Sequence, residues 1–185
     1  MVAVGQNGNG RANQKVAVKP YRYYHVSVDV RTQDLDTPGN VNVTILGHDG
    51  RSLQHRSLPV KRTMPWTTID TTFNSLDNTE VQFYVGVWAG RKGTIWWDNV
   101  GLEPGGLVNL VRRPGAPFNV TSPDGQTVFV EGRDFAGAKD PKPGNVAWRG
   151  DYDFWHAGPI MTLPKGSRIK PGDTVLASYC HTELV

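Results

Sequence analysis

Short apolar runs separated by turn-forming residues recur along this 185-residue sequence and limit the folds open to it. The runs are only about four to eight residues long, and apolar residues keep a helical spacing for no more than about two turns. Glycine and proline, with 21 and 13 residues, supply frequent turns. Short extended runs joined by regular turns are typical of an antiparallel β-sandwich. The sequence therefore predicts an all-β fold.

Turn signals indicate where the strands end and where the chain divides. The segment Glu103-Pro104-Gly105-Gly106 both stops a strand and permits a change of direction, so it is the predicted domain boundary. We expect a sandwich domain over residues 1–104 and a smaller β-rich region over residues 105–185. Strands are expected at about 14–19, 22–32, 40–47, 52–60, 66–73, 80–88 and 94–103, and then near 118–120, 128–131, 159–163 and 174–180.

Charge and cysteine content argue against some classes of protein. Lys and Arg exceed Asp and Glu by 20 to 17, and the surplus is spread along the chain. A nucleic-acid-binding protein usually gathers its positive charge into a patch, so no nucleic-acid partner is expected. No run of about eighteen apolar residues is present to span a membrane. Cys180 is the only cysteine, so no disulfide can form within the chain.

Alternation within the strands separates an apolar face from a polar and aromatic one. Valines occupy one side of residues 22–31 and of residues 81–88, and rings and hydrogen-bonding groups occupy the other. If these strands share a sheet, the outward face can stack on sugar rings and bind their hydroxyls. A second interpretation is that residues 107–185 cover this face and the rings form an interdomain core. The predicted ligand-binding residues are Tyr23, His25, Asp29, Arg31, Gln82, Tyr84, Trp88 and Trp97.

Two adjacent tryptophans, Trp96 and Trp97, follow a glycine turn at Gly93. Neighbouring residues on a strand point to opposite faces, so one indole can anchor the core while the other faces outward. If the outward indole is Trp97, Asn99 lies beside it on the same face.

An ordered set of motifs in residues 14–104 resembles one family of binding modules. These are the carbohydrate-binding modules of the galactose-binding-like jelly-roll type, which are attached to xylanases and other β-glycanases. The resemblance implies a two-sheet jelly roll that binds polysaccharide through aromatic residues, is not catalytic and belongs to a secreted bacterial protein. The motifs that carry it are Gln14-Lys15-Val16-Ala17-Val18-Lys19-Pro20, Tyr24-His25-Val26-Ser27-Val28-Asp29-Val30-Arg31, Trp66-Thr67-Thr68, Phe73-Asn74-Ser75 and Gly93-Thr94-Ile95-Trp96-Trp97-Asp98-Asn99-Val100.

The same resemblance bears on metal binding and assembly. Such modules often hold a structural calcium near the strand with the Asp-Asn-Val signature, which implies that Asp98 is a calcium ligand. Calcium takes about six to eight oxygens, and in the family some come from an N-terminal strand that we expect to be missing here. We therefore expect a truncated N-terminal edge, and an open sheet edge of this kind favours a homodimer.

Residues 107–185 resemble the small β-rich segment that precedes a catalytic barrel in some large secreted bacterial glycosidase-like proteins. This resemblance implies a catalytic domain downstream in the parent protein. It is carried by Arg113-Pro114-Gly115-Ala116-Pro117, Asp124-Gly125-Gln126-Thr127-Val128, Glu131-Gly132-Arg133-Asp134-Phe135 and Gly166-Ser167-Arg168-Ile169-Lys170-Pro171-Gly172-Asp173.

Carboxylates in this second region raise the question of hydrolysis. Glycoside hydrolysis uses two carboxyl groups about 5–10 Å apart. Asp151 with Asp153, or Glu131 with Asp134, could supply them, but such residues are commonly turn formers. No catalytic residue is predicted, and the aromatic stretch 148–156 is expected to be a second contact surface or a plug over the interdomain core.

Three hypotheses for function follow, in order of preference. The first is a non-catalytic module that binds β-linked glycans. The second is a scaffold that positions a downstream glycosidase-like barrel and has no ligand of its own. The third, least favoured, is a hydrolase that depends on Asp151 or Glu131.

Overall fold

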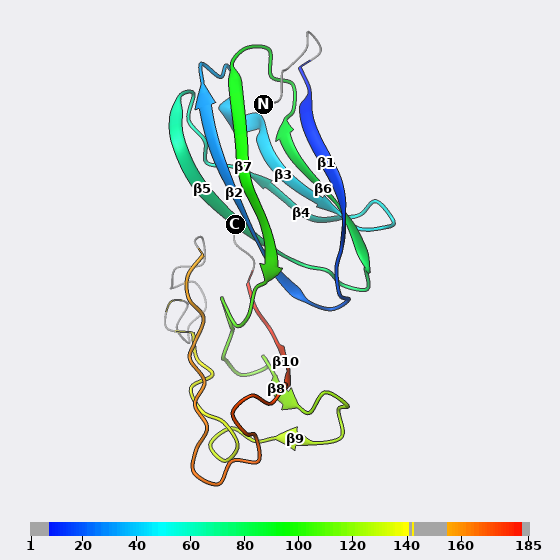
Figure 1. Cartoon of the computed structure of the whole chain (residues 1–185), viewed down its shortest axis with the longest axis vertical. Helices are drawn as coiled ribbons and strands as arrows, with labels where there is room; N and C mark the ends of the chain where they lie inside the picture. Colours follow the sequence, from blue (N-terminus) through cyan, green and yellow to red (C-terminus); the bar gives the residue numbers. More distant parts are fainter. Residues whose placement is uncertain (1–7, 141, 143–154, 183–185) are drawn as a thin grey trace. The chain divides into compact units, whose positions relative to one another are not determined.

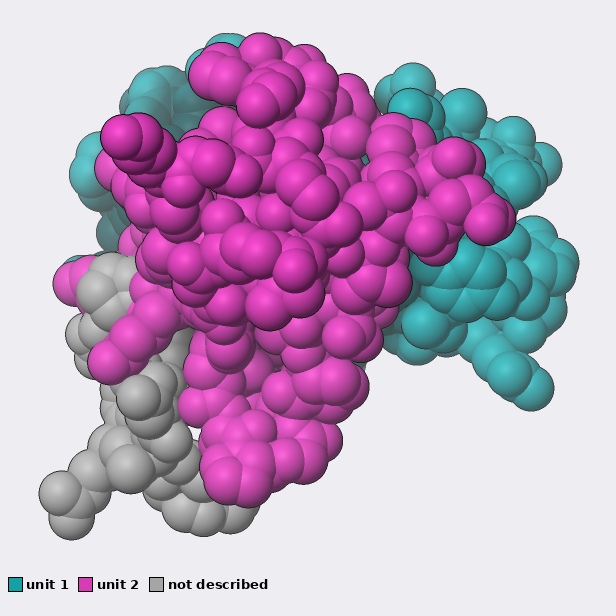
Figure 2. All heavy atoms as spheres, turned by 90° about the horizontal axis from the view of Figure 1, so that it is seen from below, with its two compact units in different colours: residues 1–105, 185 teal, residues 106–184 magenta. Residues whose placement is uncertain are grey.

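The structure, a computed structural model, describes residues 8–140, 142 and 155–182. It divides into two compact units, residues 1–105 and residues 106–184, which are coloured separately in Figure 2. The division falls between the two glycines of the Pro104-Gly105-Gly106 segment. In the described residues there is no helix with the length and apolarity that crossing a bilayer requires.

The first unit is an antiparallel β-sandwich (Figure 1). One sheet has the strand order β1-β6-β3-β4 and the other has the order β5-β2-β7. Successive strands mostly alternate between the two sheets, with β3 and β4 as a hairpin within one of them. The all-β sandwich expected from the sequence is confirmed. Its strands are β1 (Gly10–Ala17), β2 (Tyr23–Gln33), β3 (Val41–Leu46), β4 (Ser52–Ser57), β5 (Met64–Asn74), β6 (Glu80–Val87) and β7 (Thr94–Pro104).

The core of this unit lies between the two sheets and is built by alternation. Every second side chain of β2 points inward, and the same holds for β3 and β6. Tyr24 of β2 stacks on Phe73 of β5 with ring centroids 5.4 Å apart. The buried strand residues of this core are Tyr24, Val26, Val28, Val30, Val41, Val43, Ile45, Met64, Ile69, Phe73, Val81, Phe83, Val85, Val87 and Ile95.

The prediction that β2 and β6 present one common outward face is wrong. β2 is the middle strand of the three-stranded sheet, whereas β6 lies in the four-stranded sheet. Both strands turn their valines into the shared core, so their polar and aromatic side chains point in opposite directions, out of the two sides of the sandwich. The predicted ligand-binding residues are therefore divided between two surfaces.

A glycine turn precedes β7, and it admits no larger residue. Gly93 has φ +116°, and a Cβ there would lie 2.6 Å from Leu35 Cα and 2.7 Å from the Leu35 backbone nitrogen. Gly93→Ala is expected to lower the free energy of unfolding by about 2–4 kcal/mol, because both the backbone angle and the close approach disfavour a side chain. Urea unfolding followed by circular dichroism measures this.

Gly39→Ala is the matched control for this turn. Gly39 lies in the short 3-10 helix Pro38–Asn40, and a Cβ there would meet nothing within 4 Å. Its unfolding midpoint should stay close to that of the wild type. Equal midpoints for the two variants would show that the turn at Gly93 is not tightly packed.

The second unit is smaller and has less regular structure. Its strands are β8 (Phe118–Thr121), β9 (Val128–Phe129) and β10 (Leu176–Tyr179), in the order β10-β8-β9. The strand expected near 159–163 is reduced to one isolated bridge, between Ala136 and Thr162. A core of its own holds this unit together and contains Leu110, Val120, Phe135, Ala138 and Ile169.

Candidate functional site

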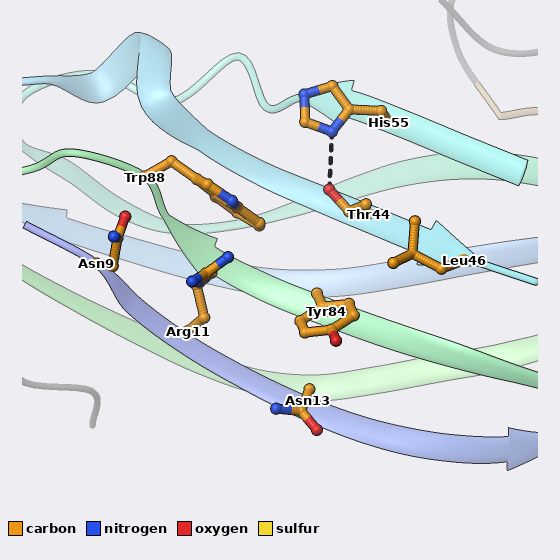
Figure 3. Close-up of a pocket in the computed structure, with 8 residues that line it drawn as sticks. All are labelled: Asn9, Arg11, Asn13, Thr44, Leu46, His55, Tyr84 and Trp88. Atoms are coloured by element: carbon orange, nitrogen blue, oxygen red, sulfur yellow. Dashed lines mark hydrogen bonds between the residues drawn. The ribbon is translucent and has the colours of Figure 1, made fainter. Parts of the chain in front are cut away.

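An open groove with a volume of about 490 Å³ lies on the outer face of the four-stranded sheet. Alternation on β1, β3, β4 and β6 directs its side chains outward, on the side opposite the core. Across the strands, Tyr84 is paired with both Asn13 and Thr44, and Thr44 is paired with His55. The residues that line the groove are Asn9, Arg11, Asn13, Thr44, Leu46, His55, Tyr84 and Trp88 (Figure 3).

Trp88 lies at one end of this groove, directly after β6, and is partly exposed. The Arg11 guanidinium carbon lies 5.3 Å from the centre of its ring, and the two side chains point toward one another in Figure 3. The His55 ring meets the indole edge-on, with centroids 6.3 Å apart. His55 is itself held by Thr44, whose Oγ1 lies 2.8 Å from its Nδ1. An indole is thus fixed at the groove with a cation and an imidazole against it.

Two of the predicted ligand-binding residues line this groove, namely Tyr84 and Trp88. Gln82 is on the same face of β6 but is not among the lining residues. Sequence reasoning missed Arg11 and Asn13, because β1 was expected to begin at residue 14 and begins at Gly10. The outward position of Thr44 could have been predicted, because it alternates with the buried residues of β3. Nothing in the sequence marked His55 as a groove residue beyond its place on a polar strand.

The remaining predicted residues of β2 lie on the outer face of the other sheet. His25 is only 5% exposed, and its Nε2 and Nδ1 lie 2.8 Å from Asp70 Oδ1 and 2.9 Å from Glu103 Oε1. Tyr23 is 7% exposed, and its ring lies against Gly105. This end of β2 is therefore packed and hydrogen-bonded, not open to a ligand.

The residues of β2 that pair with the two tryptophans of β7 show which side of the sheet each indole occupies. Trp97 is paired with the inward Val30 and packs against the core, whereas Trp96 is paired with the outward Arg31. The Arg31 guanidinium carbon lies 4.8 Å from the centre of the Trp96 ring. The outward indole is thus Trp96, and the expectation that Trp97 faces outward is corrected.

Asp29 and Asn99 meet where β7 bulges away from the regular register with β2. Asn99 has φ +47°, and its Nδ2 donates to Asp29 Oδ2 at 2.7 Å, while Thr68 Oγ1 donates to Asp29 Oδ1 at 2.6 Å. The hydrogen bond from Thr68, followed by that from Asn99, lowers the pKa of Asp29. Asp29 is therefore a fixed, ionised group that stabilises the bulge.

The calcium that the resemblance implies at Asp98 stays a prediction. Asp98 is paired with Asp29 across the two strands, and its Oδ1 accepts a hydrogen bond from the Asn99 backbone N–H. Within residues 8–140, 142 and 155–182, no three His, Cys, Asp or Glu side chains gather as a metal site.

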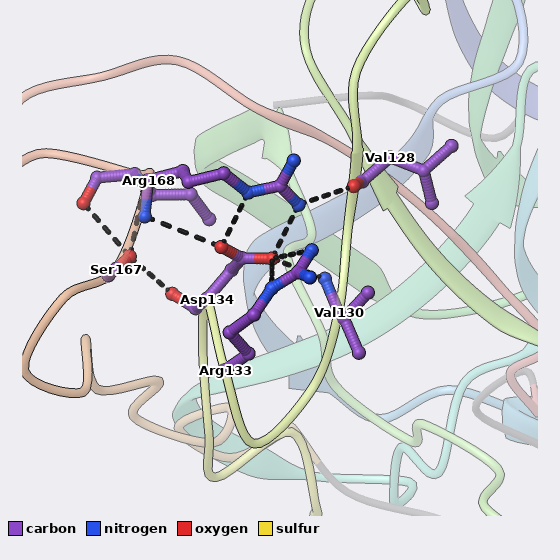
Figure 4. Close-up of polar contacts among 7 residues, drawn as sticks. Val128, Val130, Arg133, Asp134, Ser167 and Arg168 are labelled. Carbon is purple, nitrogen blue, oxygen red and sulfur yellow. Dashed lines mark hydrogen bonds and ion pairs between the residues drawn. The ribbon is translucent and has the colours of Figure 1, made fainter.

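The carboxylates considered for hydrolysis have structural partners where the structure describes them. Glu131 Oε2 accepts from Arg112 Nη2 at 2.6 Å. Asp134 has a fully buried side chain that accepts from Arg168 Nη2 at 2.7 Å and from the Val130 backbone N–H at 2.8 Å (Figure 4). The hydrogen bond from Arg168 is the main reason that the pKa of Asp134 lies well below its usual range. Asp151, Asp153 and most of the stretch 148–156 lie outside the described residues.

Of the comparisons with known proteins, the one with solved structures found similar chains. No protein-family model and no curated protein matches this chain. A solved structure described as "CBM4 structure and function", a carbohydrate-binding module, is 22% identical to it with a TM-score of 0.44. That similarity covers 51% of this chain and 61% of the other, so the chain spans about three fifths of the length of the structure it matches. The function proposed below rests on the residues of the groove.

Proposed function

We propose that the first unit is a non-catalytic module that binds a β-linked glycan in the groove of its four-stranded sheet. The observation that carries this proposal is the partly exposed Trp88 set in an open groove among polar side chains. An indole face packs against the C–H groups of a pyranose ring, which is the usual way that aromatic side chains bind sugars.

The polar side chains of the groove complement that aromatic platform. Asn13 and the hydroxyl of Tyr84 lie along the groove from Trp88 (Figure 3) and offer donors and acceptors to sugar hydroxyls. Thr44 and His55 are held together and form its other wall. Their positions on neighbouring strands make the site rigid before a ligand arrives, which lowers the entropic cost of binding.

The wider setting follows the sequence resemblance. We propose that the chain belongs to a secreted, bacterial polysaccharide-degrading protein whose catalytic domain lies downstream. In that setting the module keeps the enzyme at its polysaccharide and takes no part in bond cleavage.

Titration of the full chain with soluble glycans tests the proposal. Xylan, β-glucan or cello-oligosaccharides should bind with dissociation constants in the micromolar to millimolar range, which is about −8 to −4 kcal/mol. Isothermal titration calorimetry measures the affinity. A change in the nuclear magnetic resonance shift of the Trp88 indole N–H on titration shows that the glycan binds in the groove. An absence of binding to all three glycans at millimolar concentration would contradict the proposal.

A second candidate function, a scaffold that positions a catalytic barrel, has its own supporting observation. Tyr23 and His25 belong to an outer sheet face, yet both are buried. Outward residues that are packed in this way within the first unit favour a structural role for this face over ligand binding. Tryptophan quenching separates the two functions, since a glycan should protect Trp88 from a soluble quencher only if the groove binds it.

A further inference from the structure

The groove on the four-stranded sheet has an unbalanced charge. Its lining contains one arginine and one histidine, and none of the eight lining residues is an aspartate or a glutamate. A neutral sugar has no need of a cation there, because amide and hydroxyl groups are sufficient to bind its hydroxyls. An excess of positive charge in a concave site instead attracts anions.

Arg11 is the strongest source of this charge, and no carboxylate within the described residues neutralises it. Its guanidinium carbon lies over the Trp88 ring, 5.3 Å from the ring centre, in a cation–π contact. By contrast Lys15, four residues along the same strand, is paired with Glu80 at 2.9 Å. The N–H groups of a guanidinium form a planar fork that matches the two oxygens of a carboxylate.

His55 adds a second nitrogen beside the same indole. Its Nδ1 is engaged with Thr44 Oγ1, and its ring edge meets Trp88. Arg11 and His55 thus approach one indole from two strands, β1 and β4 (Figure 3). A carboxylate on a sugar ring that packs beside Trp88 would lie within reach of both side chains.

We propose that the groove selects an acidic β-glycan, one whose sugar rings carry carboxylates, over the neutral polymer with the same backbone. This inference rests on the proposed function, since it names the ligand class of the same groove. The indole supplies packing area for the ring, and the Arg11 fork binds the carboxylate in place of water. A neutral sugar hydroxyl can also accept a hydrogen bond from the guanidinium, but it lacks the negative charge that strengthens this contact with a carboxylate.

A matched pair of ligands isolates the carboxylate. Cello-oligosaccharides and the same oligosaccharides oxidised at C6 differ only in a hydroxymethyl group replaced by a carboxylate. The full chain should bind the oxidised form at least about tenfold more tightly in low salt, and the preference should shrink as salt screens the charges. Calorimetry at two salt concentrations measures both effects.

Two arginine variants test which side chain causes the preference for the oxidised oligosaccharide. Arg11→Gln should remove most of the preference for the oxidised ligand, so that the ratio of the two affinities falls close to one. Arg31→Gln removes the arginine of a second arginine–tryptophan pair, on the opposite sheet, and should keep the preference. Both arginines are exposed, so neither variant should change the melting temperature by more than about 2 °C.

The outcomes separate this inference from the proposed function. Equal binding of the two oligosaccharides overturns the charge preference and leaves glycan binding in place, whereas binding of neither overturns both. Loss of the preference with Arg31→Gln, but not with Arg11→Gln, would indicate that the carboxylate binds on the other sheet. That result would overturn the inference. Equally tight binding of a single-stranded oligonucleotide would indicate recognition of any polyanion and would also contradict it.

Discussion

Replacing Trp88 with alanine is expected to weaken glycan binding by about thirtyfold or more, the effect of truncating a central aromatic side chain in a binding site. Trp88 is the only tryptophan among the groove residues, and its indole supplies the packing surface between Arg11 and His55. Its loss removes apolar contact area from the ligand and also releases the guanidinium that it holds. Titration of the full chain with the best-binding oligosaccharide measures the change.

Trp66→Ala is the matched control for this experiment. Trp66 belongs to β5 of the other sheet, and at 48% exposure it is also an accessible tryptophan. Its removal should leave the affinity within about twofold of the wild type, while both variants keep the wild-type melting temperature within about 2 °C. If Trp66→Ala weakened binding as much as Trp88→Ala, the groove would not be the site.

Replacing Asp134 with asparagine is expected to have the largest effect on stability in the second unit. The carboxylate accepts from Arg168, from Arg133 and from the Val130 backbone N–H, and its own backbone carbonyl accepts from Ser167 (Figure 4). These bonds join segments that are far apart in the sequence. Asparagine removes the charge and one acceptor, so buried donors lose their partner. We expect the melting temperature of this unit to fall by at least about 5 °C.

Hydrogen exchange of the full chain shows where the loss occurs. Peptides that contain Val120 and Phe135, from the core of the second unit, should exchange faster in Asp134→Asn, and peptides from β2 and β6 should not change. Glu131→Gln is the matched control, because it removes a more exposed ion pair with Arg112 and should have little effect. Similar exchange in both variants would show that Asp134 does not hold this unit together.

The lowered pKa of Asp134 leads to a prediction of how the free energy of unfolding depends on pH. Arg168 lowers the pKa of Asp134 in the folded chain below that of the unfolded chain, where Asp titrates near about 3.9. Its contribution to stability is therefore fully present above that value and is lost as the pH falls through the lower, folded pKa. The wild type should lose stability below about pH 4 more steeply than Asp134→Asn. Thermal melts between about pH 2 and pH 6 measure the difference.

Local patterns predicted most strands of the first unit with small errors at their ends, whereas β1 begins at Gly10 and not at residue 14 as expected. Turn residues and alternation within a strand act over a few neighbours, so they can be read without knowing the fold. They placed β2 and β6 within about two residues and separated the core valines from the outward Tyr84. The same reasoning failed near residues 159–163, where only one bridge forms. An apolar run there lacks a partner strand, and a strand needs a partner for its hydrogen bonds.

Only some residues of the candidate site could be predicted from local sequence patterns. Tyr84 and Trp88 could be predicted because aromatic residues alternate with valines on one strand. Arg11 and His55 could not, because they come from β1 and β4, which become neighbours of the same indole only when the sheet forms. Asp29 and His25 looked equivalent to Tyr84 by pattern, yet they belong to the opposite face of the sandwich.

By itself the sequence determined the fold class, the positions of most strands and which side chains of each strand face the core. Alternation guarantees that much, because it depends on the geometry of one strand. Only the tertiary structure decided which strands share a sheet, and with that, which outward residues meet in one groove and which of Trp96 and Trp97 faces out. Distant segments of the chain compete to form the same backbone hydrogen bonds. The pattern of residues within a single strand therefore does not determine which strand pairs with it.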